Sequence, residues 1–371
     1  MHVAVSVLCG PTGGPATYGR QLVAALRATD AVQLTVLTDR PEELDGSGYD
    51  IVHLPMRRGV DRLRWQYWAL PRALRALDCD LYHDTKNALP HLLPMPSVVT
   101  VHDLAYYRRP EGFGHFSRVF LRRATAGAVA RARLVIVPSR STAADVAEIY
   151  PRQAHKTRVV PHGIEPHRAA SASRRQAVRL RYGLEGPFVL HVGTIQARKN
   201  VHLLVRAVRK LRGEGFPHRC VLVGRRGWLA AEALEEVQRD DTAAWLGVIP
   251  GSDLEALYEL ADLFVSPSAY EGFGLTVADA LAAGTPTVIS DVSSLPEVCG
   301  PAAARIRELS AEGIADAVRP LLRNGPERQR LGAAGRQRAS EFRWDRAAEQ
   351  TAEVYREALG DGAQARAAGF R

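Results

Sequence analysis

The sequence predicts a two-domain α/β protein in which each domain is a doubly wound parallel sheet covered by helices on both faces. Three observations predict it. The chain has 371 residues, which exceeds the usual size of a single domain. Short runs rich in Val, Ile and Leu alternate with longer stretches of helical period, as in parallel sheets. This alternation stops at a segment rich in Pro, Ser, Ala and Arg and then restarts.

Strands are expected where the apolar runs are short and bounded by Gly, Pro, Asp or Ser. The first half holds six such runs and the second half holds five. In the first half they are HVAVSVL (2–8), VQLTVLT (32–38), YDIVHLP (49–55), CDLYHD (79–84), SVVTVHD (97–103) and ARLVIVPS (132–139), and in the second half PFVLHVG (187–193), CVLVG (220–224), AAWLGVI (243–249), DLFVSPS (262–268) and TPTVISD (285–291).

The segment KTRVVPHGIEPHRAASASRRQ, residues 156–176, is the expected linker between the two domains. We place the boundary between residues 161 and 180, and assign 1–170 to the first domain and 171–344 to the second. The final stretch, 345–371, has helical period and is expected to rejoin the first domain. Ligands of doubly wound sheets bind at the carboxyl ends of the strands, so we expect the site in the crevice between the domains.

The composition, with 46% hydrophobic and 24% charged residues, is typical of a globular protein. The start MHVAVSVLCG lacks the basic region and apolar length of a signal peptide, and no stretch approaches the roughly 18 apolar residues of a membrane span. We therefore expect a cytoplasmic protein. The scattered cysteines indicate neither a zinc site nor a disulfide framework, and no metal site is predicted. They are Cys9, Cys79, Cys220 and Cys299.

Positive charge is concentrated in one segment. Residues 57–133 contain 14 Lys and Arg against 6 Asp and Glu, which is a net +8 out of +9 for the whole chain. A general compositional bias toward Arg would spread along the chain, so we expect a basic face on the first domain that meets an anionic acceptor or a membrane surface. The alternative is a solvated face. Nucleic acid is the weaker functional interpretation, because no recognised binding module frames the mixed stretch RRGVDRLRWQYW.

Two strand-to-helix turns carry residues suited to bind phosphate. Gly13 and Gly14 precede an amphipathic stretch, so backbone amides can approach a phosphate there, although a plain tight turn explains the glycines equally. Arg198 and Lys199 stand between FVLHVG and VHLLVRAVRKL, in a turn that begins at Thr194. Two cations beside the amides of a helix N-terminus can hold a diphosphate. The alternative is a pair of solvated surface cations.

The stretch EGFGLTVADA, residues 271–280, places two carboxylates, Glu271 and Asp279, around a Gly-Phe-Gly. It lies between the strand DLFVSPS and a helix, in the loop at a carboxyl strand end. The two glycines free the backbone to curve around a ligand, and the first amides of the helix can face a phosphate. Asp279 can accept two hydrogen bonds from a vicinal diol such as a ribose. Alternatively, it closes a capping box with Thr276.

Taken together, these motifs resemble those of family 4 of the retaining glycosyltransferases. The resemblance spans most of the chain and implies the GT-B architecture, in which two Rossmann-like domains face a central cleft. The first domain would bind the acceptor and the second the nucleotide-sugar donor. The motifs that carry the resemblance are HVGTIQARKN, WLGVIPGSDLEALYELADLFVSPSAYEGFGLTVADALAAGTPTVISDVSSLPEV, VTVHDLAYYRRPE and RVVPHGIE.

The resemblance implies a bacterial hexosyltransferase that needs no metal and no cofactor, with the nucleotide sugar as its substrate. The expected donor is a GDP-mannose-like sugar or a UDP-sugar. The expected acceptor is a sugar, a glycolipid or a small molecule in glycan, glycolipid or natural-product biosynthesis. The enzyme is then expected in the cytoplasm or at the inner face of the plasma membrane. The expected mechanism is front-face attack by the acceptor, with a double displacement through Glu271 as the alternative.

Site roles follow residue by residue from the same resemblance. Arg198 and Lys199 match the diphosphate-binding pair, and Glu271 matches the first acid of the E-x7-E motif beside the transferred sugar. His102 matches a first-domain histidine near the sugar; a strand-end histidine bonded to Asp103 is the alternative. The catalytic residues are thus expected to be His102, Arg198, Lys199 and Glu271, and the donor-binding residues Gly13, Gly14, Thr194, Arg198, Lys199, Ile249, Glu271, Gly272, Phe273, Gly274, Leu275 and Asp279.

Two positions depart from the family pattern. Asp279 stands where the family usually has Glu, and His162 stands where its linker often has Asn before Gly. We interpret His162 as a turn residue. Two rival functions share the predicted architecture. A sugar-nucleotide 2-epimerase has the same fold and needs no acceptor, and a two-domain solute-binding protein normally carries a secretion signal.

Overall fold

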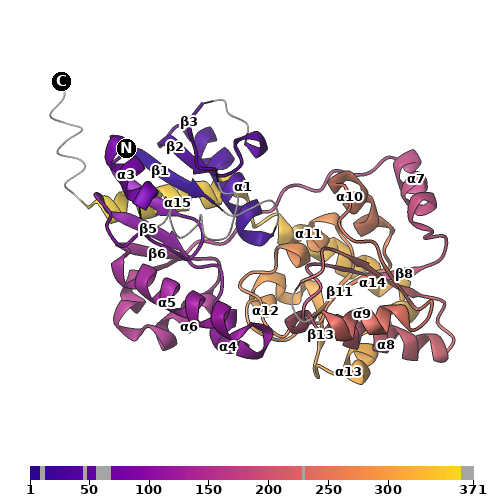
Figure 1. The fold of residues 1–371 in the computed structure, drawn as a ribbon. Coiled ribbons are helices and arrows are strands. Elements are labelled where there is room, and N and C mark those ends of the chain that lie inside the picture. The colour runs from indigo at the N-terminus through magenta and orange to yellow at the C-terminus, as the bar shows by residue number, and fades with distance from the viewer. Residues whose placement is uncertain (9–12, 45–47, 56–67, 228–229, 361–371) are drawn as a thin grey trace. The chain divides into compact units, whose positions relative to one another are not determined.

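The computed structural model describes residues 1–371 except 9–12, 45–47, 56–67, 228–229 and 361–371, which Figure 1 draws as a thin trace. By their contacts, the residues form two compact units. The first unit comprises Met1–Leu104, His115–Gly163 and Phe342–Arg371. The second comprises Ala105–Gly114 and Ile164–Glu341. The chain passes from the first unit to the second between Gly163 and Ile164, which is before the boundary between residues 170 and 171 expected from the sequence. Residues 105–114 also belong to the second unit.

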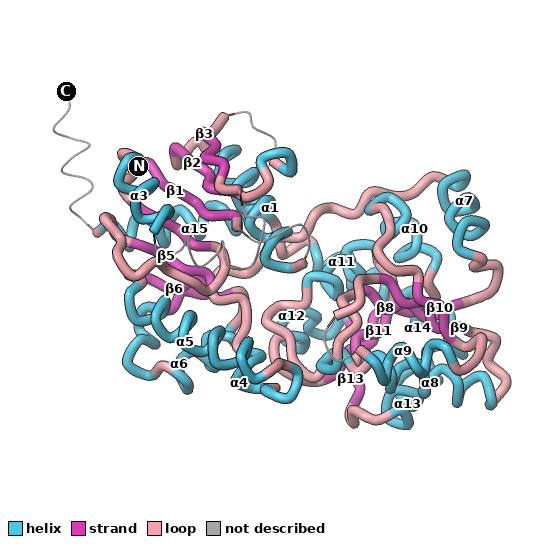
Figure 2. Tube along the Cα trace, viewed as in Figure 1, coloured by secondary structure: helices cyan, strands magenta, loops and turns pink. Residues whose placement is uncertain are grey.

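A seven-stranded parallel sheet of order β3-β2-β1-β4-β5-β6-β7 forms the centre of the first unit (Figure 2). Its inner strands are buried on both faces, which explains why they are continuous apolar runs in the sequence. Val3 on the central strand pairs with Leu34 on one side and Leu81 on the other. The strands are β1 (His2–Val7), β2 (Gln33–Thr38), β3 (Asp50–His53), β4 (Leu81–Asp84), β5 (Ser97–Thr100), β6 (Leu134–Val137) and β7 (Thr157–Val159).

Helices cover this sheet, and α15, the last helix of the described residues, is one of them (Figure 1). The C-terminal helix α15 packs on α1 and on strands β5 and β6. Its small residues Ala348 and Ala352 and the ring of Tyr355 enter the same apolar core as Val3 and Val5 of β1. The helices of this unit are α1 (Gly14–Ala28), η1 (Pro41–Glu43), α3 (Leu70–Ala76), α5 (His115–Arg131), α6 (Arg140–Ile149), η4 (Pro151–Lys156) and α15 (Trp344–Leu359).

A buried chain of hydrogen bonds ties α15 to the sheet. The Tyr355 hydroxyl lies 2.7 Å from Nδ1 of His83, and Nε2 of His83 lies 2.8 Å from the Thr100 hydroxyl. The Thr100 hydroxyl in turn lies 3.1 Å from the Tyr18 hydroxyl of α1. Burial lowers the pKa of His83 to about 3, so the ring is neutral at pH 7. Because every member has a partner, this polar chain sits in the core without an unsatisfied group.

The second unit is built on a six-stranded parallel sheet of order β10-β9-β8-β11-β12-β13. Its strands are β8 (Phe188–Val192), β9 (Arg219–Val223), β10 (Ala243–Trp245), β11 (Leu263–Ser266), β12 (Thr287–Ser290) and β13 (Ala303–Ile306). Its helices are α4 (Ala105–Arg108), η3 (Pro110–Gly112), α7 (Ala172–Tyr182), η5 (Ala197–Lys199), α8 (Val201–Gly213), α9 (Ala231–Gln238), α10 (Gly251–Leu260), α11 (Leu275–Ala283), α12 (Leu295–Cys299), η6 (Gly300–Ala302), α13 (Ala311–Arg323) and α14 (Gly325–Ala339).

Two strands are not predicted by the short apolar runs of the sequence. β7 has the sequence TRV and β13 the sequence AARI, and each lies at an edge of its sheet. An edge strand pairs on one side only and is less buried than a central strand, so it needs fewer Val, Ile and Leu residues. This is why β7 falls inside the segment that the sequence assigns to the linker.

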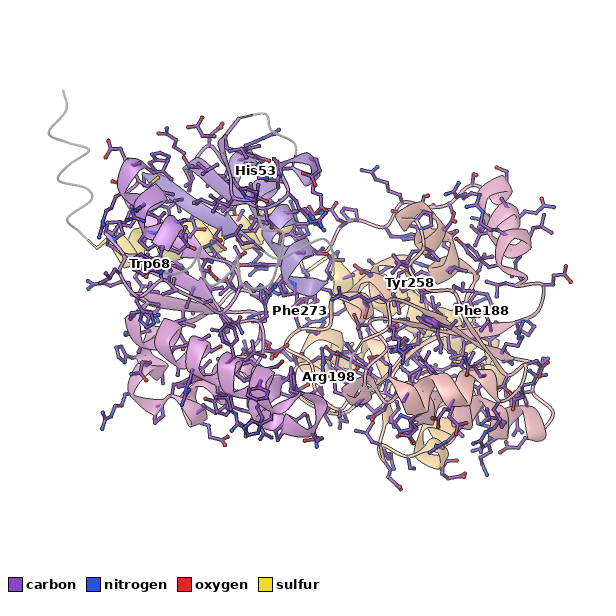
Figure 3. All side chains as sticks on the ribbon, viewed as in Figure 1. His53, Trp68, Phe188, Arg198, Tyr258 and Phe273 are labelled. Carbon is purple, nitrogen blue, oxygen red and sulfur yellow. The ribbon has the colours of Figure 1, made fainter. Side chains whose placement is uncertain are left out.

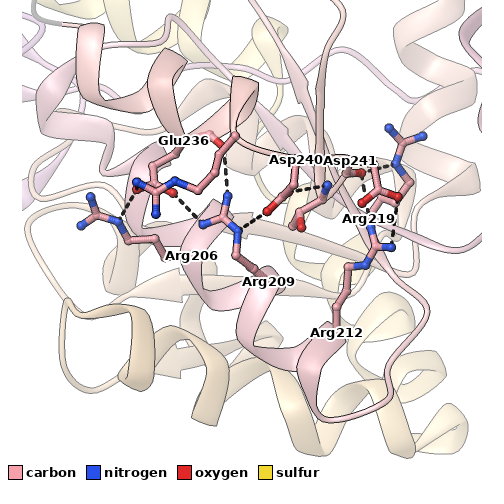
Figure 4. Close-up of polar contacts among 9 residues, drawn as sticks. Arg206, Arg209, Arg212, Arg219, Glu236, Asp240 and Asp241 are labelled. Atoms are coloured by element: carbon pink, nitrogen blue, oxygen red, sulfur yellow. Dashed lines mark hydrogen bonds and ion pairs between the residues drawn. The ribbon is translucent and has the colours of Figure 1, made fainter.

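Helices α8 and α9 are joined by ion pairs around one buried carboxylate, Glu236 (Figure 4). The Glu236 side chain is 2% exposed, with Oε1 2.8 Å from Nε of Arg206 and Oε2 2.6 Å from Nη1 of Arg209. Arg209 also binds Asp240 at 2.6 Å. The network holds α9 against α8, directly after the turn that carries Arg198.

Both sheets have a switch point where the strand order reverses, between β1 and β4 in the first unit and between β8 and β11 in the second. Loops at the carboxyl ends of these strands form the expected ligand site of such sheets. Within the described residues, no helix is both long and apolar enough to cross a membrane, and no group of three or more His, Cys, Asp or Glu is arranged to hold a metal ion.

Candidate active site

The β8–α8 turn places Arg198 and Lys199 at the switch point of the second unit. After β8 the chain passes through Gly193 and Thr194 into the short helix η5, which contains both cations. Asn200 then adopts a left-handed conformation, with φ of 50°, immediately before α8. Its side-chain amide donates to the Pro267 carbonyl at 2.9 Å. The turn is therefore tied to the loop that follows β11.

The β11–α11 loop carries the Gly-Phe-Gly. Gly274 has φ of 93°, a backbone conformation that favours glycine, and a Cβ there would lie 2.8 Å from Cδ2 of Leu295. Helix α11 begins directly after it, at Leu275, and no side chain caps its start. The capping-box alternative is therefore wrong, because Thr276 lies inside the first turn of α11 and Gly274 occupies the N-cap position.

These two loops meet in an ion pair network centred on Glu271. Nη1 of Arg198 donates to the Tyr270 carbonyl at 2.6 Å and to Oε2 of Glu271 at 3.1 Å, while Nζ of Lys199 pairs with Oε1 of Glu271. All three charged side chains are largely buried. Burial opposes ionisation of Glu271, but the charges of Lys199 and Arg198 prevail and lower its pKa to about 2. The structure thus brings the adjacent cations Arg198 and Lys199 to Glu271, which is 72 positions from Lys199 in the chain.

The backbone of Glu271 is fixed by the loop after β12. Its amide donates to the Ser293 hydroxyl at 2.8 Å, and the Ser294 hydroxyl donates to its carbonyl at 2.9 Å. Phe273 is buried nearby in the same loop. In Figure 3, Phe188 at the start of β8 and Arg198 beyond its end lie at opposite ends of that strand, with Phe273 on the Arg198 side. The candidate site is thus at the carboxyl end of the sheet.

Asp279 lies on α11, one turn into the helix. Burial, together with the neighbouring carboxylate of Glu165, raises the pKa of Asp279 to about 7. Sequence reasoning assigns no role to Glu165, which follows the linker turn. The other predicted donor residue, Ile249, is half-buried in the loop between β10 and α10. The Gly247 carbonyl of that loop accepts a hydrogen bond from Gly224, at the end of β9.

His191 of β8 is a second residue that sequence reasoning does not single out. Its Nδ1 donates to the Val265 carbonyl at 2.9 Å, whereas its buried Nε2 has no hydrogen-bond partner in the described structure. A Cβ on Gly193 would lie 3.6 Å from that Nε2 and 4.0 Å from Nζ of Lys199. Burial lowers the pKa of His191 to about 4, so it is a neutral acceptor beside the ion pair. The signal in the sequence that could have pointed to His191 is a histidine within the otherwise apolar run FVLHV.

The remaining predicted residues belong to the first unit. Gly13 has φ of 111° and is the N-cap of α1, and Gly14 is its first residue. His102 follows β5, with Nε2 2.7 Å from the Thr85 carbonyl and Nδ1 3.4 Å from Nε2 of His162. These contacts replace the bond to Asp103 considered from the sequence. Burial lowers the pKa of His102 to about 4, although the Thr85 carbonyl opposes the shift.

Comparison with known proteins identifies the chain. Residues 12–168 match the model described as "Glycosyltransferase Family 4", and residues 175–338 match "Glycosyl transferases group 1", so the two matches together span most of the chain. This protein belongs to glycosyltransferase family 4. The prediction of the family is confirmed, and with it the prediction that the chain is a glycosyltransferase.

Relatives of this glycosyltransferase include O-antigen chain mannosyltransferase B of Escherichia coli, 28% identical over 79% of this chain and 77% of the relative. They also include a glycogen synthase of Mycobacterium tuberculosis, 29% identical over 93% of this chain and 82% of the relative. Among solved structures, Anabaena HepE in complex with UDP and glucose aligns with a TM-score of 0.78 at 18% identity, covering 95% of this chain and 98% of that chain. This likeness confirms the predicted fold of two Rossmann-like domains.

Proposed function

We propose that this glycosyltransferase moves a hexosyl unit from a nucleoside diphosphate sugar to an acceptor hydroxyl, with retention of anomeric configuration and without a metal. The observation that carries the proposal is the buried network of Arg198, Lys199 and Glu271 at the switch point of the second sheet. Arg198 and Lys199 present two largely buried cations side by side at the carboxyl end of the sheet. Charge-assisted hydrogen bonds from such cations are the contacts that a diphosphate requires.

Donor binding exchanges the partners of this network. The diphosphate takes Arg198 and Lys199, together with amides at the start of α11, and Glu271 turns toward hydroxyls of the sugar. The same cations then stabilise the leaving diphosphate, because charge develops on its bridging oxygen as the glycosidic bond breaks. Fixed cations in a water-poor site can supply the stabilisation that other transferases obtain from a divalent metal.

The proposed reaction is a front-face displacement. The acceptor oxygen forms a bond to the anomeric carbon on the face from which the diphosphate leaves, and the bond between that carbon and the phosphate oxygen breaks. The acceptor proton passes to a leaving phosphate oxygen, so no protein base is required. In this scheme Glu271 accepts hydrogen bonds from hydroxyls of the sugar. A double displacement through Glu271 is the less favoured alternative.

Other residues of the proposed donor site follow from the family resemblance. Asp279 accepts hydrogen bonds from the ribose diol, and the backbone at Ile249 meets the base. Gly272–Leu275 and Thr194 border the sugar and phosphates. In the first unit, Gly13–Gly14 close over the phosphates and His102 orients the sugar.

The donor is proposed to be a GDP-mannose-like sugar or a UDP-sugar. The mannosyltransferase relative supports the first, and the likeness to a structure that holds UDP and glucose supports the second. We propose a sugar, glycolipid or small-molecule acceptor, and a site of action in the cytoplasm or at the inner face of the plasma membrane.

A donor screen tests this function. Each nucleotide sugar is added to the protein and the melting temperature is measured, since a ligand at 100 times its Kd stabilises by about 2.7 kcal/mol. The best donor is then incubated with acceptors, and NMR of the product gives its anomeric configuration. An inverted product contradicts retention. Accumulation of an epimerised nucleotide sugar without any acceptor establishes the epimerase instead.

Substitutions test the network itself. Arg198→Ala and Lys199→Ala should each lower kcat/KM for the donor on the order of tenfold to a hundredfold, because charged hydrogen bonds contribute about 1.5–3 kcal/mol. Lys210→Ala is the matched control, since Lys210 pairs with Glu312 on an exposed surface of the same unit. Wild-type turnover in both active-site variants would show that the diphosphate binds elsewhere.

A further inference from the structure

The imidazole of His191 lies at the point where the pairing between the two central strands of the second sheet stops. The pairing of β8 with β11 ends at Leu190 and Phe264, one residue before His191. Nδ1 of His191 donates to the Val265 carbonyl, the next one along β11, at 2.9 Å. The ring is therefore held at the switch point itself, where ligands of such sheets bind.

The second ring nitrogen of His191 is an acceptor without a hydrogen-bond partner among the described residues. A carbonyl only accepts, so Nδ1 carries the ring proton and Nε2 carries a lone pair. Burial lowers the pKa of His191 to about 4, so the ring is neutral at pH 7. The residue is 1% exposed, and a buried polar atom costs free energy until a donor reaches it.

Lys199 is a donor that lies near this nitrogen. A Cβ on Gly193 would lie 3.6 Å from Nε2 of His191 and 4.0 Å from Nζ of Lys199, so the two nitrogens border the same α-carbon. Because the residue is glycine, no side chain stands between them. The positive charge of Lys199 also contributes to the lowered pKa of His191. The ammonium has three N–H groups, and its printed partner is Oε1 of Glu271.

We propose that Nε2 of His191 accepts a hydrogen bond from the Lys199 ammonium when a diphosphate is bound, which makes His191 a positioning residue for that cation. The proposal rests on the proposed exchange in which Glu271 releases Lys199. After that exchange, the ammonium must keep its place against the phosphates without the carboxylate. A neutral acceptor, itself fixed by Val265, orients one N–H and leaves the positive charge for the phosphate oxygens.

Ring NMR tests the contact. Nitrogen-15 spectra at pH 7 should show His191 protonated at Nδ1 alone. The Nε2 signal should move when UDP or GDP saturates the protein, because an accepted hydrogen bond changes the shielding of that nitrogen. In K199A, saturation with the same nucleotide should leave the Nε2 signal in place. A signal that neither nucleotide moves in wild type, or that moves equally in K199A, would overturn the proposal.

Substitutions of His191 isolate the role of Nε2. H191F removes both ring nitrogens, whereas H191Q keeps a carbonyl acceptor about as far along the side chain as Nε2. H191F should bind nucleoside diphosphate about tenfold more weakly in calorimetry, and H191Q should recover part of that loss. H218F is the control, because His218 is also buried but precedes β9, at the opposite end of the sheet, with Nε2 3.6 Å from Asp262.

A double-mutant cycle shows whether His191 acts through Lys199. If it does, H191F should cost little affinity in a protein that already carries K199A, since the group that His191 orients is gone. Fully additive losses would overturn the proposal and leave the diphosphate site intact. Diphosphate binding that K199A does not weaken would remove both the diphosphate assignment and the role of His191. The failure of the proposal is thus distinguishable from that of the proposed function.

A separate observation in the first unit concerns His162, which the sequence suggests is a turn residue. The His162 ring is buried and stacks on Trp344 with an interplanar angle of 14°. Its centroid lies 4.5 Å from that of Tyr18. A Cβ on Gly163 would lie 2.4 Å from Cγ of Trp344, so the indole packs directly on the backbone there. These contacts hold the His162 ring in one orientation.

The hydrogen bonds of His102 define what that ring does. Nε2 of His102 faces the Thr85 carbonyl at 2.7 Å, and a carbonyl only accepts, so Nε2 carries the proton. Nδ1 is then the acceptor, and the group 3.4 Å away, Nε2 of His162, must donate to it. We infer that His162 is a positioning residue that fixes the tautomer and the plane of His102. This inference rests on the proposed role of His102 toward the sugar.

Ring NMR and kinetics together test this second inference. Nitrogen-15 spectra of the wild type at pH 7 should show His102 protonated at Nε2 alone. H162F keeps an aromatic ring between Trp344 and Tyr18 but cannot donate; it should give a mixed tautomer and a kcat about tenfold lower, at nearly unchanged donor KM. H162Q, whose side-chain amide restores a donor, should recover part of both.

The control for His162 is H155F, at an exposed histidine of η4. An unchanged His102 spectrum in H162F would overturn the positioning role, whatever the activity. A changed spectrum with unchanged kcat would leave His162 as the positioning residue and remove His102 from the reaction. The two failures are therefore distinguishable.

Discussion

Nζ of Lys199, in the turn after β8, forms an ion pair with Oε1 of Glu271, in the loop after β11, and the two side chains are buried together at the end of the sheet. The two residues are 72 positions apart in the chain. The carboxylate of Glu271 is thus paired with a cation, Lys199, that would bind the diphosphate of the proposed donor. Binding of a diphosphate must therefore break a buried pair, and this competition can be measured.

Removing the competing charge should strengthen diphosphate binding. In Glu271→Gln, the amide pairs less strongly with Lys199 and Arg198, so the affinity for free nucleoside diphosphate should rise about tenfold. Turnover of the nucleotide sugar should nevertheless fall, since the sugar loses its carboxylate partner. Calorimetry with UDP and GDP and steady-state kinetics supply the two measurements. Weaker binding of both diphosphates would show that Glu271 does not compete for the cations.

Donor binding should depend on pH through Asp279. Its pKa is raised to about 7, so the carboxyl is mostly protonated below pH 7 and ionised above it. An ionised carboxylate accepts both hydrogen bonds of a ribose diol, so affinity should rise between pH 6 and 8, a window of about one unit on either side of that pKa. Nucleotide sugars are the ligands to use, because their diphosphate does not titrate in this range. The rise should be absent in Asp279→Asn and retained in Asp279→Glu.

The ribose assignment has its own test. Wild type should prefer a ribonucleotide to its 2′-deoxy analogue, and Asp279→Ala should lose that preference, with affinity reduced by about 1.5–3 kcal/mol. Melting temperature should not fall, because Asp279 does not cap α11 and its buried carboxyl has a raised pKa. A preference that survives in the alanine variant would assign the ribose to another residue.

Acid should destabilise the fold through buried neutral histidines. The pKa values of His83, His102 and His191 are lowered to about 3, 4 and 4 by burial. In the unfolded chain each ring takes up a proton below its ordinary pKa of about 6.5. The stability from these neutral rings is therefore complete above pH 6.5 and is lost as pH falls toward 4. Denaturant unfolding at several pH values measures the slope.

Asp279 contributes with the opposite sign, since its raised pKa makes the folded state hold a proton between about pH 4 and 7. The slope should accordingly be steeper in Asp279→Asn than in wild type, and shallower in His191→Phe. A stability that does not change between pH 7 and 5 in Asp279→Asn would mean that the three rings are charged in the fold.

The α8–α9 network should show that burial decides the value of an ion pair. Glu236→Ala leaves two arginines facing a buried gap and should cost about 1–3 kcal/mol of unfolding free energy. Asp241→Ala removes a carboxylate that is 76% exposed, 3.2 Å from Nη2 of Arg212, and should cost less than about 1 kcal/mol. Equal costs in the two variants would contradict the buried character of Glu236.

The family motifs, the two sheets and the turns that hold Arg198, Lys199 and Glu271 can be predicted from the sequence, because short apolar runs and glycine turns are local signals. Edge strands such as β7 cannot be predicted in this way. An edge strand pairs on one side only, so it tolerates a sequence such as TRV, which resembles a linker sequence. The start of α11 also depends on the fold. Thr276 and Asp279 have the spacing of a cap, but the left-handed Gly274 begins the helix earlier.

Local sequence pattern determined which residues are candidates for the site, since residue type and position after a strand can be read from the sequence itself. Only the tertiary structure decided their partners and their protonation. Lys199 meets Glu271 because β8 and β11 are neighbours in the sheet, and His102 faces His162 because the linker turn returns to the end of β5. The pKa values of Asp279 and His191 depend on desolvation and on nearby charges, and both are set by segments distant in sequence.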